Sequence, residues 1–168
     1  MLIRHRGVKG FTLIELAIGL VLLSILLMLA IPSMTLIVEN GRIKSAASSF
    51  AMGLQTARAH AISQNGNVTF TPSGSGWSVT DSTGAVIEGK AAAESSGDRV
   101  DVDNATVVTF NGLGRPTPPP PSPPDAYFFN FTRPSVAEAR SLRIRLSAGG
   151  QVRLCDPLAT AAGDTRAC

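Results

Sequence analysis

The side chains that could take part in chemistry stand close to the two ends of this chain. Glu15 is an acid inside an otherwise apolar run, and the two cysteines, Cys155 and Cys168, lie near the C-terminus. An acid inside a membrane costs about 2.5–3.5 kcal/mol on insertion scales unless a partner is paired with it. A cut between Gly10 and Phe11 would create a free amino group near Glu15, and this pairing is the first chemistry that the sequence suggests.

The apolar run around Glu15 is long enough to cross a bilayer. It covers residues 11–31 and is otherwise interrupted only by Thr12, Gly19 and Ser24. At about 1.5 Å per residue, a helix of this length spans the hydrocarbon core of about 30 Å. We therefore expect a transmembrane helix near the N-terminus.

The first ten residues carry the net charge of the chain. The whole sequence has 15 Lys and Arg against 12 Asp and Glu, and residues 1–10 hold three of the bases and no acid, so the remainder has 12 of each. Basic residues ahead of a span keep that end in the cytoplasm. The charge of +3 therefore indicates membrane topology, and the apolar content of 44% excludes a wholly disordered chain.

Two ordinary explanations of this N-terminus stay open, a cleaved signal peptide and a plain signal anchor. The run is longer than the 7–15 residues of a signal-peptide core, and residues 28–30 (Met-Leu-Ala) make a poor cleavage site. Neither explanation accounts for Glu15.

Residues 10–16, Gly-Phe-Thr-Leu-Ile-Glu-Leu, resemble the processing site of type IV prepilins. The resemblance implies that a prepilin peptidase cuts between Gly10 and Phe11 and methylates the amino group of Phe11. It also implies that Glu15 pairs with the N-terminal amine of a neighbouring subunit during filament assembly. Glycine suits such a site, because the missing Cβ lets the peptidase approach the backbone.

The helix is predicted to continue beyond the membrane. An apolar stripe recurs at steps of three and four, while Arg42, Ser45, Ser49, Gln55 and His60 mark the opposite, polar side. The stripe consists of Ile43, Ala47, Phe50, Leu54, Ala57 and Ala61.

The sequence contains residues that should weaken this helix and residues that should end it. Pro32 and Gly41 weaken it, and in the resembling family this interval can kink or locally melt in a filament. Asn65-Gly66 predicts the helix end, since either residue can adopt the left-handed cap conformation.

Beyond residue 66 the hydrophobic period changes to two. Short candidate strands are separated by Gly, Pro, Ser and Asp, which is typical of antiparallel sheets. The predicted fold is α+β, with a long N-terminal helix, half transmembrane and half amphipathic, packed on a small antiparallel head of about seven strands in two sheets. The candidates are residues 68–71, 76–80, 85–88, 105–110, 126–131, 142–147 and 151–155.

The order of a stalk helix, about seven strands and a cysteine-bearing tail resembles the GspH/FimT family of minor pilins and pseudopilins, and FimT-like minor pilins in particular. Further likenesses lie at residues 56–62, 108–115, 154–157 and 163–168. The resemblance implies a minor subunit of a type IV pilus that acts in pilus assembly. The alternative within filaments is a GspH-type pseudopilin of the type II secretion system.

The domain organisation follows from this resemblance. Residues 1–10 are a basic leader that is cleaved, residues 11–38 a transmembrane and assembly helix, and residues 39–168 a periplasmic head. The implied location is the inner membrane, crossed once, with assembly into a pilus or pseudopilus. The implied partners are the prepilin peptidase, the membrane and other pilins or minor pilins through the N-terminal helix.

The two cysteines are predicted to form a disulfide, because the head lies outside the cytoplasmic membrane, where disulfides persist. Closing a loop of about 14 residues is worth roughly 3 kcal/mol in the chain-entropy model. We expect no metal and no cofactor, since two thiols and two distant histidines do not make four ligands.

Two further segments have ordinary interpretations. Residues 116–124 are rich in proline and predict a stiff polyproline II surface loop, with docking of a partner protein as the alternative. Asp98, Asp101 and Asp103 lack the spacing of a calcium loop and are interpreted as solvated loop charge.

The sequence offers no enzymatic site. His60 stands among alanines of the expected helix, and the common hydrolase, metalloprotease and phosphate-loop motifs are absent from the sequence. We therefore expect a structural protein.

The C-terminal quarter is rich in arginine. Alternation in residues 142–146 places Arg143 and Arg145 on one face of a strand, and a turn at 147–150 would bring Arg153 beside Arg145. Guanidinium groups without an intervening acid can bind DNA phosphates. The alternative is a charged face that protects an edge strand from aggregation.

FimT-like pilins have been proposed as DNA-uptake receptors that use a Gly-Arg-x-Arg motif in this region. Here residues 150–153 read Gly-Gln-Val-Arg, so only Arg153 matches directly, with Arg143 and Arg145 on the adjacent strand as substitutes. A DNA-binding receptor subunit for natural transformation is thus the hypothesis from another functional class.

Overall fold

The computed structural model describes residues 10–95, 100–121, 126–136, 138–161 and 163–168, without the side chains of residues 29–33 and 95. The chain divides into two compact units, Met1–Thr35 and Leu36–Cys168. We call the second the head unit and describe each unit by itself.

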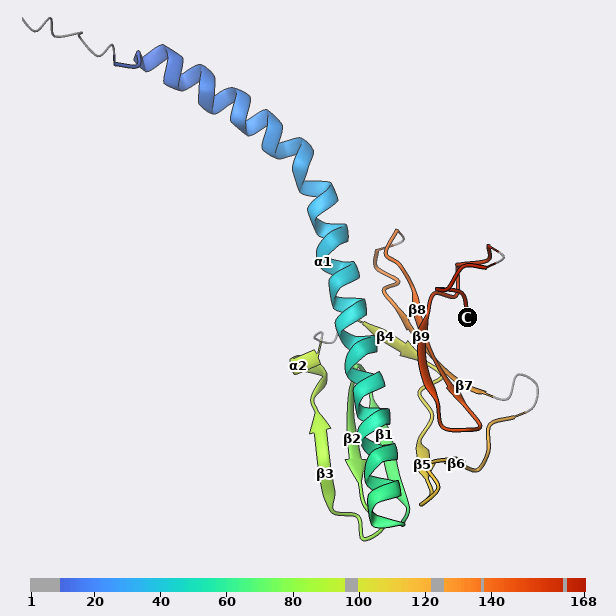
Figure 1. The fold of residues 1–168 in the computed structure, drawn as a ribbon. Coiled ribbons are helices and arrows are strands. Elements are labelled where there is room, and N and C mark those ends of the chain that lie inside the picture. The colour runs from blue at the N-terminus through green and yellow to red at the C-terminus, as the bar shows by residue number, and fades with distance from the viewer. Residues whose placement is uncertain (1–9, 96–99, 122–125, 137, 162) are drawn as a thin grey trace, which may run out of the picture. The chain divides into compact units, whose positions relative to one another are not determined.

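Helix α1, Leu13–Gln64, is continuous through Pro32 and Gly41 (Figure 1). It ends where the sequence predicts, because Asn65 adopts a positive φ of 45° and the Gly66 N–H donates to the Ala61 carbonyl over 3.1 Å. The kink between Pro32 and Gly41 was predicted for subunits packed in a filament. The single chain does not test it, so it stays a prediction.

Within the described part of the chain, we find no helical stretch with the length and apolar character that a membrane crossing needs. The span predicted for residues 11–38 includes five residues whose side chains are not described.

The first sheet follows α1 in the sequence and has the strand order β3-β2-β1-β5-β6, with all pairs antiparallel. Its inward-facing residues include Phe70, Trp77 and Phe110, all buried. The strands are β1 Val68–Ser73, β2 Gly76–Thr80, β3 Val86–Lys90, β5 Val108–Phe110 and β6 Pro116–Thr117.

The second sheet has the order β4-β7-β8-β9, again antiparallel throughout. Its buried face presents Phe129, Phe131, Ile144 and Leu146. The strands are β4 Asp101–Asp103, β7 Ala126–Thr132, β8 Leu142–Ser147 and β9 Val152–Cys155.

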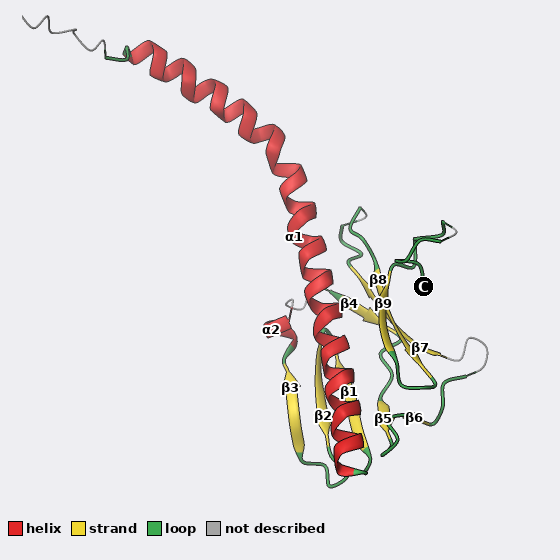
Figure 2. Ribbon diagram, in the orientation of Figure 1, coloured by secondary structure: helices red, strands yellow, loops and turns green. Residues whose placement is uncertain are grey.

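The part of α1 within the head unit joins the two sheets (Figure 2). The Phe50 ring lies 5.6 Å from Phe70 of the first sheet and 5.1 Å from Phe131 of the second, both edge to face. All six residues of the predicted apolar stripe are fully buried. The predicted α+β class, a helix packed on two antiparallel sheets, is therefore confirmed, with nine strands among the described residues rather than about seven.

Three local predictions were wrong. Asp101 and Asp103 belong to β4 rather than to a loop, because β7 supplies a pairing edge for them, although their side chains are exposed. The proline-rich segment begins as edge strand β6 rather than as a loop, and residues 122–124 of it lie outside the described residues. Ser49 is buried rather than solvent-facing, because its hydroxyl accepts a 2.9 Å hydrogen bond from the Trp77 indole N–H.

A four-residue helix, α2 Ala92–Ser95, follows β3 and was not predicted.

Candidate functional site

The N-terminal motif lies at the start of α1 with its side chains exposed. Phe11 is 87% exposed, and Glu15 is in the first helical turn, where the helix dipole favours an acid. Thr12 caps the helix, since its Oγ1 accepts the Glu15 backbone N–H over 3.3 Å. This role was not predicted from the sequence, although Thr-x-x-Glu before an apolar run is a recognised capping pattern.

Gly10 occupies open space. A Cβ built at this position meets no described heavy atom within 4 Å. The fold of the chain therefore does not itself require a glycine here, and any requirement must come from another molecule.

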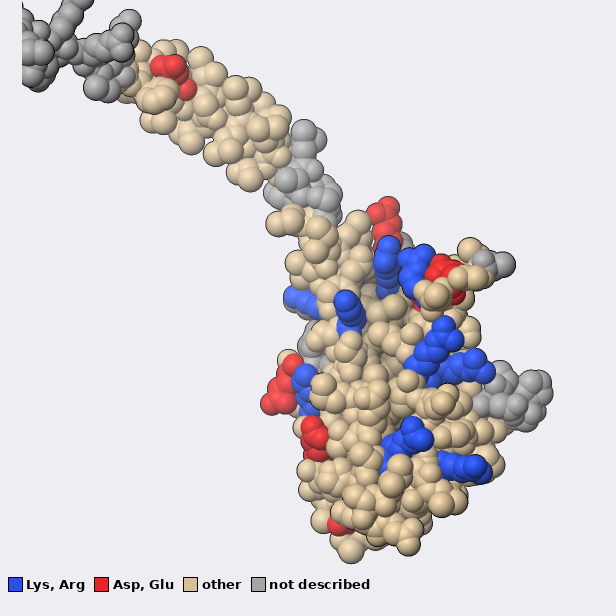
Figure 3. Space-filling model, viewed as in Figure 1, with Lys and Arg blue, Asp and Glu red and all other residues tan. Residues whose placement is uncertain are grey.

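The arginine side of the second sheet is arranged as the sequence predicts. Arg145 pairs with Arg153 across β8 and β9, so both side chains point to one face together with Arg143. Ile144 and Leu146 are buried on the opposite face. We call the side with the three arginines the arginine face; Figure 3 shows Lys and Arg side chains spread over the side of the head unit that is visible there.

The three arginines differ in what they contact. Arg143 donates from Nε to Asn130 Oδ1 over 2.6 Å, and its guanidinium lies 5.1 Å from the Phe128 ring centroid. Arg153 donates to the Thr165 carbonyl over 2.9 Å. The buried Nε of Arg145 has no hydrogen-bond partner among the described residues.

Two of the arginines share a shallow depression of about 220 Å³. It is lined by Arg145, Ser147, Gln151 and Arg153. The structure thus brings Arg145 and Arg153 together with two neutral polar side chains, an arrangement that can bind an anionic oxygen group. It directs Arg143 toward Asn130 instead.

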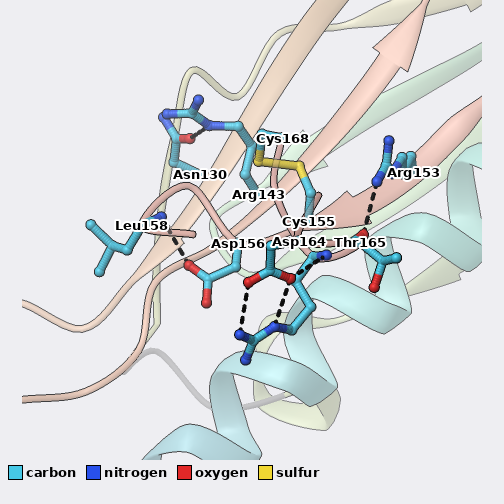
Figure 4. The surroundings of a disulfide bond; sticks show 10 residues. Asn130, Arg143, Arg153, Cys155, Asp156, Leu158, Asp164, Thr165 and Cys168 are labelled. Atoms are coloured by element: carbon cyan, nitrogen blue, oxygen red, sulfur yellow. Dashed lines mark hydrogen bonds and ion pairs between the residues drawn. A yellow bond between two sulfur atoms is a disulfide. The ribbon is translucent and has the colours of Figure 1, made fainter. Parts of the chain in front are cut away.

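The C-terminal tail folds over the arginine face (Figure 4). The predicted disulfide Cys155–Cys168 is present, and Cys155 lies opposite Arg143 in the register of β8 and β9. The Asp156 N–H donates to the Arg166 carbonyl over 2.7 Å. The disulfide therefore fixes the tail, and with it the carbonyl that accepts from Arg153.

Two residues of the tail, Asp164 and Arg166, form an ion pair with each other. Arg166 Nη2 lies 2.8 Å from Asp164 Oδ2. The hydrogen bonds from the Arg166 side chain, and secondarily from its backbone, lower the pKa of Asp164 to about 2, and Asp164 raises the pKa of Arg166. Both side chains therefore stay charged at neutral pH, and Arg166 is neutralised locally.

Arg58 has a structural role that was not predicted from the sequence. It donates from Nε to the Gly114 carbonyl over 3.1 Å and from Nη2 to the Gly149 carbonyl over 3.3 Å. Gly150, with φ of 77°, packs so closely that a Cβ there would collide with the Gly114 carbonyl oxygen. Arg58 thereby ties α1 to the β5–β6 and β8–β9 turns, and the second turn positions Arg145 and Arg153.

The described residues contain no group of three or more His, Cys, Asp and Glu side chains that could hold a metal ion. Of the acidic cluster considered in the sequence, Asp98 lies outside the described residues.

Two family models match the chain. The model of the prokaryotic N-terminal methylation motif matches residues 5–31, and that of the type II transport protein GspH matches residues 46–150. The second match covers well over half of the sequence. The chain belongs to the GspH family.

Solved structures of similar fold include other pilin-like proteins. The type IV minor pilin FimU of Pseudomonas aeruginosa is 21% identical with a TM-score of 0.52, over 69% of this chain and 90% of that one. The minor pseudopilin EpsH of the type 2 secretion system of Vibrio cholerae is 12% identical with a TM-score of 0.51, over 69% and 98%. No curated protein matches the chain significantly.

Membership of the GspH family confirms the resemblance to pilin-like proteins. The chain is a minor pilin or pseudopilin that carries the prepilin cleavage and methylation motif, from a family of structural rather than enzymatic proteins. GspH-family proteins are membrane-anchored prepilins that assemble with other pilins, and the motif implies processing by a prepilin peptidase.

Proposed function

We propose that this protein is a minor structural subunit of a type IV pilus, acting in pilus assembly. Residues 11–38 cross the inner membrane once and residues 39–168 lie in the periplasm. The prepilin peptidase cuts between Gly10 and Phe11 and methylates Phe11, and Glu15 then pairs with the terminal amine of a neighbouring pilin. The supporting observation is the methylation motif placed directly at the capped start of α1.

The empty surroundings of Gly10 make the processing step testable on its own. Gly10→Val should leave a full-length precursor, because the added side chain blocks the peptidase while the fold has room for it. Gly7→Val is the matched control and should be processed normally. Intact mass measurement of the membrane fraction distinguishes the two, and normal processing of Gly10→Val would contradict the proposed cleavage site.

Glu15 tests assembly separately from processing. Glu15→Ala should be cut after Gly10 but should be absent from sheared filaments, because the acid that pairs with the neighbouring amine is missing. Recovery of this variant in filaments at the wild-type level would show that Glu15 is not needed for assembly.

The choice between a pilus and a pseudopilus needs a phenotype. Deletion of the gene should abolish twitching or transformation if the subunit belongs to a type IV pilus. Loss of exoprotein secretion with normal twitching would instead assign the subunit to a type II secretion pseudopilus, the alternative that remains within the GspH family.

A second candidate function is DNA binding during natural transformation. It is supported by the depression that Arg145 and Arg153 share, and by the unpartnered Nε of Arg145 among the described residues. Arg143 contributes less, because Asn130 and Phe128 already contact its guanidinium.

A mobility-shift assay tests this candidate. The head unit should bind DNA in a salt-sensitive way, and Arg145→Ala with Arg153→Ala should weaken binding more than Arg143→Ala does. Arg115→Ala, an exposed arginine outside the arginine face, is the control. Binding that is unaffected by the double substitution would exclude this site.

A further inference from the structure

The start of the head unit has an excess of positive charge. Residues 39–44 of α1 and residues 133–140 before β8 together contain four bases and two acids. The bases are Arg42, Lys44, Arg133 and Arg140, and the acids are Glu39 and Glu138.

Glu39 binds two of these bases. It is 8% exposed, and its carboxylate lies 2.8 Å from Arg42 Nη1 and 3.0 Å from Arg133 Nε. Lys44 and Arg140 are exposed, and neither forms an ion pair with a described residue. Two cations are therefore available to another molecule.

The available cations lie at the rim of a groove of about 360 Å³. Asn40 holds Arg140 beside α1, since its Oδ1 accepts the Arg140 backbone N–H over 2.8 Å. Leu142 is half-buried and Leu154 is 37% exposed. The groove is lined by Asn40, Gly41, Ile43, Lys44, Arg140, Leu142 and Leu154.

This combination of an apolar lining with a cationic rim fits an acidic phospholipid. Under the proposed anchoring, apolar residues of α1 continue to Val38, and Lys44 follows only six residues later. Six helical residues rise about 9 Å, which is comparable to the thickness of one headgroup layer and to the Debye length. An acidic headgroup at the bilayer surface is therefore within reach of Lys44 and Arg140.

We propose that this groove binds an acidic phospholipid, with the phosphate at Lys44 and Arg140 and the glycerol and first methylenes against Leu142 and Leu154. The inference rests on the proposed membrane anchoring of residues 11–38. It assigns the head unit a second contact with the bilayer, which restrains the head against the membrane before the subunit enters a filament.

The test uses the membrane-inserted chain in nanodiscs that contain equal amounts of phosphatidylglycerol and phosphatidylcholine. Native mass spectrometry after transfer to detergent counts the lipids that remain bound. The wild type should retain phosphatidylglycerol preferentially, and Lys44→Gln with Arg140→Gln should lower the preference by about tenfold, because each cation near an anionic surface contributes to attraction.

Two further variants separate this groove from general charge. Lys90→Gln with Arg115→Gln removes the same charge elsewhere and should leave the preference unchanged. Leu154→Ser keeps both cations and should also lower retention of phosphatidylglycerol, which a simple anion site would not show.

Unchanged lipid preference in Lys44→Gln with Arg140→Gln would overturn the proposal, as would an equal loss in the control pair. The same spectra give the mass of the chain, so a failure of cleavage after Gly10 is distinguishable from a failure of lipid binding. An unaltered disulfide and unfolding midpoint show that each variant is folded.

Discussion

Helix α1 is continuous, but its side chains are exposed in its first part and buried along one stripe in its second part. From Leu13 to Met28 every described side chain is exposed, whereas the stripe from Ile43 to Ala61 is fully buried against both sheets. The glycines show the same contrast. A Cβ on Gly19 or Gly41 meets nothing within 4 Å, but one on Gly53 would lie 2.7 Å from Trp77 and 2.8 Å from Phe70.

This contrast separates residues whose type is explained by packing within the head unit from residues whose type is not. Residues of the buried stripe are determined by the fold of the chain itself, because each contacts other parts of the head unit. The described side chains of residues 10–28 are exposed, so packing in the head unit does not account for their apolar character or for the motif at Gly10–Leu16, and we infer that these residues serve other molecules. For a pilin-like chain these are the peptidase, the membrane and neighbouring subunits.

The largest expected effect on stability is at Phe50, which joins both sheets. Phe50→Ala should lower the free energy of unfolding by about 3–5 kcal/mol, because it removes a buried ring and leaves a cavity. Leu22→Ala, at a residue that is 57% exposed, should change head unfolding by less than about 0.5 kcal/mol. Chemical denaturation followed by Trp77 fluorescence measures the free energy of unfolding of both variants. Equal losses in the two variants would contradict the difference between the buried and the exposed part of α1.

Removal of the disulfide tests how strongly the tail is held. Cys155→Ser with Cys168→Ser should cost roughly 3 kcal/mol, since an open tail regains its chain entropy. Leu158→Ala, at a residue that is 73% exposed in the same tail, is the control. A melting curve unaffected by loss of the disulfide would mean that the tail adds nothing to the head.

The glycines of α1 give a smaller and more direct test. Gly53→Ala should destabilise the head by about 1–3 kcal/mol, because the added methyl overlaps two aromatic rings. Gly41→Ala has open space and should stabilise the helix by up to about 1 kcal/mol. Changes in the free energy of unfolding that have the same sign for both variants would contradict the difference in packing between these two positions.

The smallest expected effect on stability comes from the protonation of Asp164 in the C-terminal tail. Its pKa in the folded state is lowered to about 2, below its unfolded value of about 3.9. The stability that its pair with Arg166 contributes is therefore present above the unfolded pKa and is lost as the pH falls through about 2. The NMR carboxyl shift of Asp164 should titrate with a midpoint near 2, and Arg166→Gln should move that midpoint upward. A midpoint at the ordinary value in the wild type would mean that the pair does not form.

Periodic sequence signals predicted the elements with the strongest patterns. The helical stripe, the helix end at Asn65 and the pairing of Arg145 with Arg153 follow from residue spacing and from one turn. Strand β4 was not predictable in this way, because Asp101 and Asp103 have low strand propensity and pair only because β7 offers an edge. Its existence depends on tertiary context.

The candidate site was predictable in its positions but not in its contacts. Alternation placed Arg143 with the other two arginines, but only the fold shows that Asn130 and Phe128 contact it. Arg58 lies in a segment that resembles the family, but its contacts could not be predicted, since its partners are the carbonyls of Gly114 and Gly149, far away in the sequence. Hydrogen bonds between distant segments have no local pattern.

The intact mass of the protein purified from its native membrane shows whether the N-terminal segment is a processed assembly signal. We expect a chain that begins at Phe11, carries one added methyl group and retains the disulfide. A chain that begins after Ala30, or one that keeps all of residues 1–10, would contradict it.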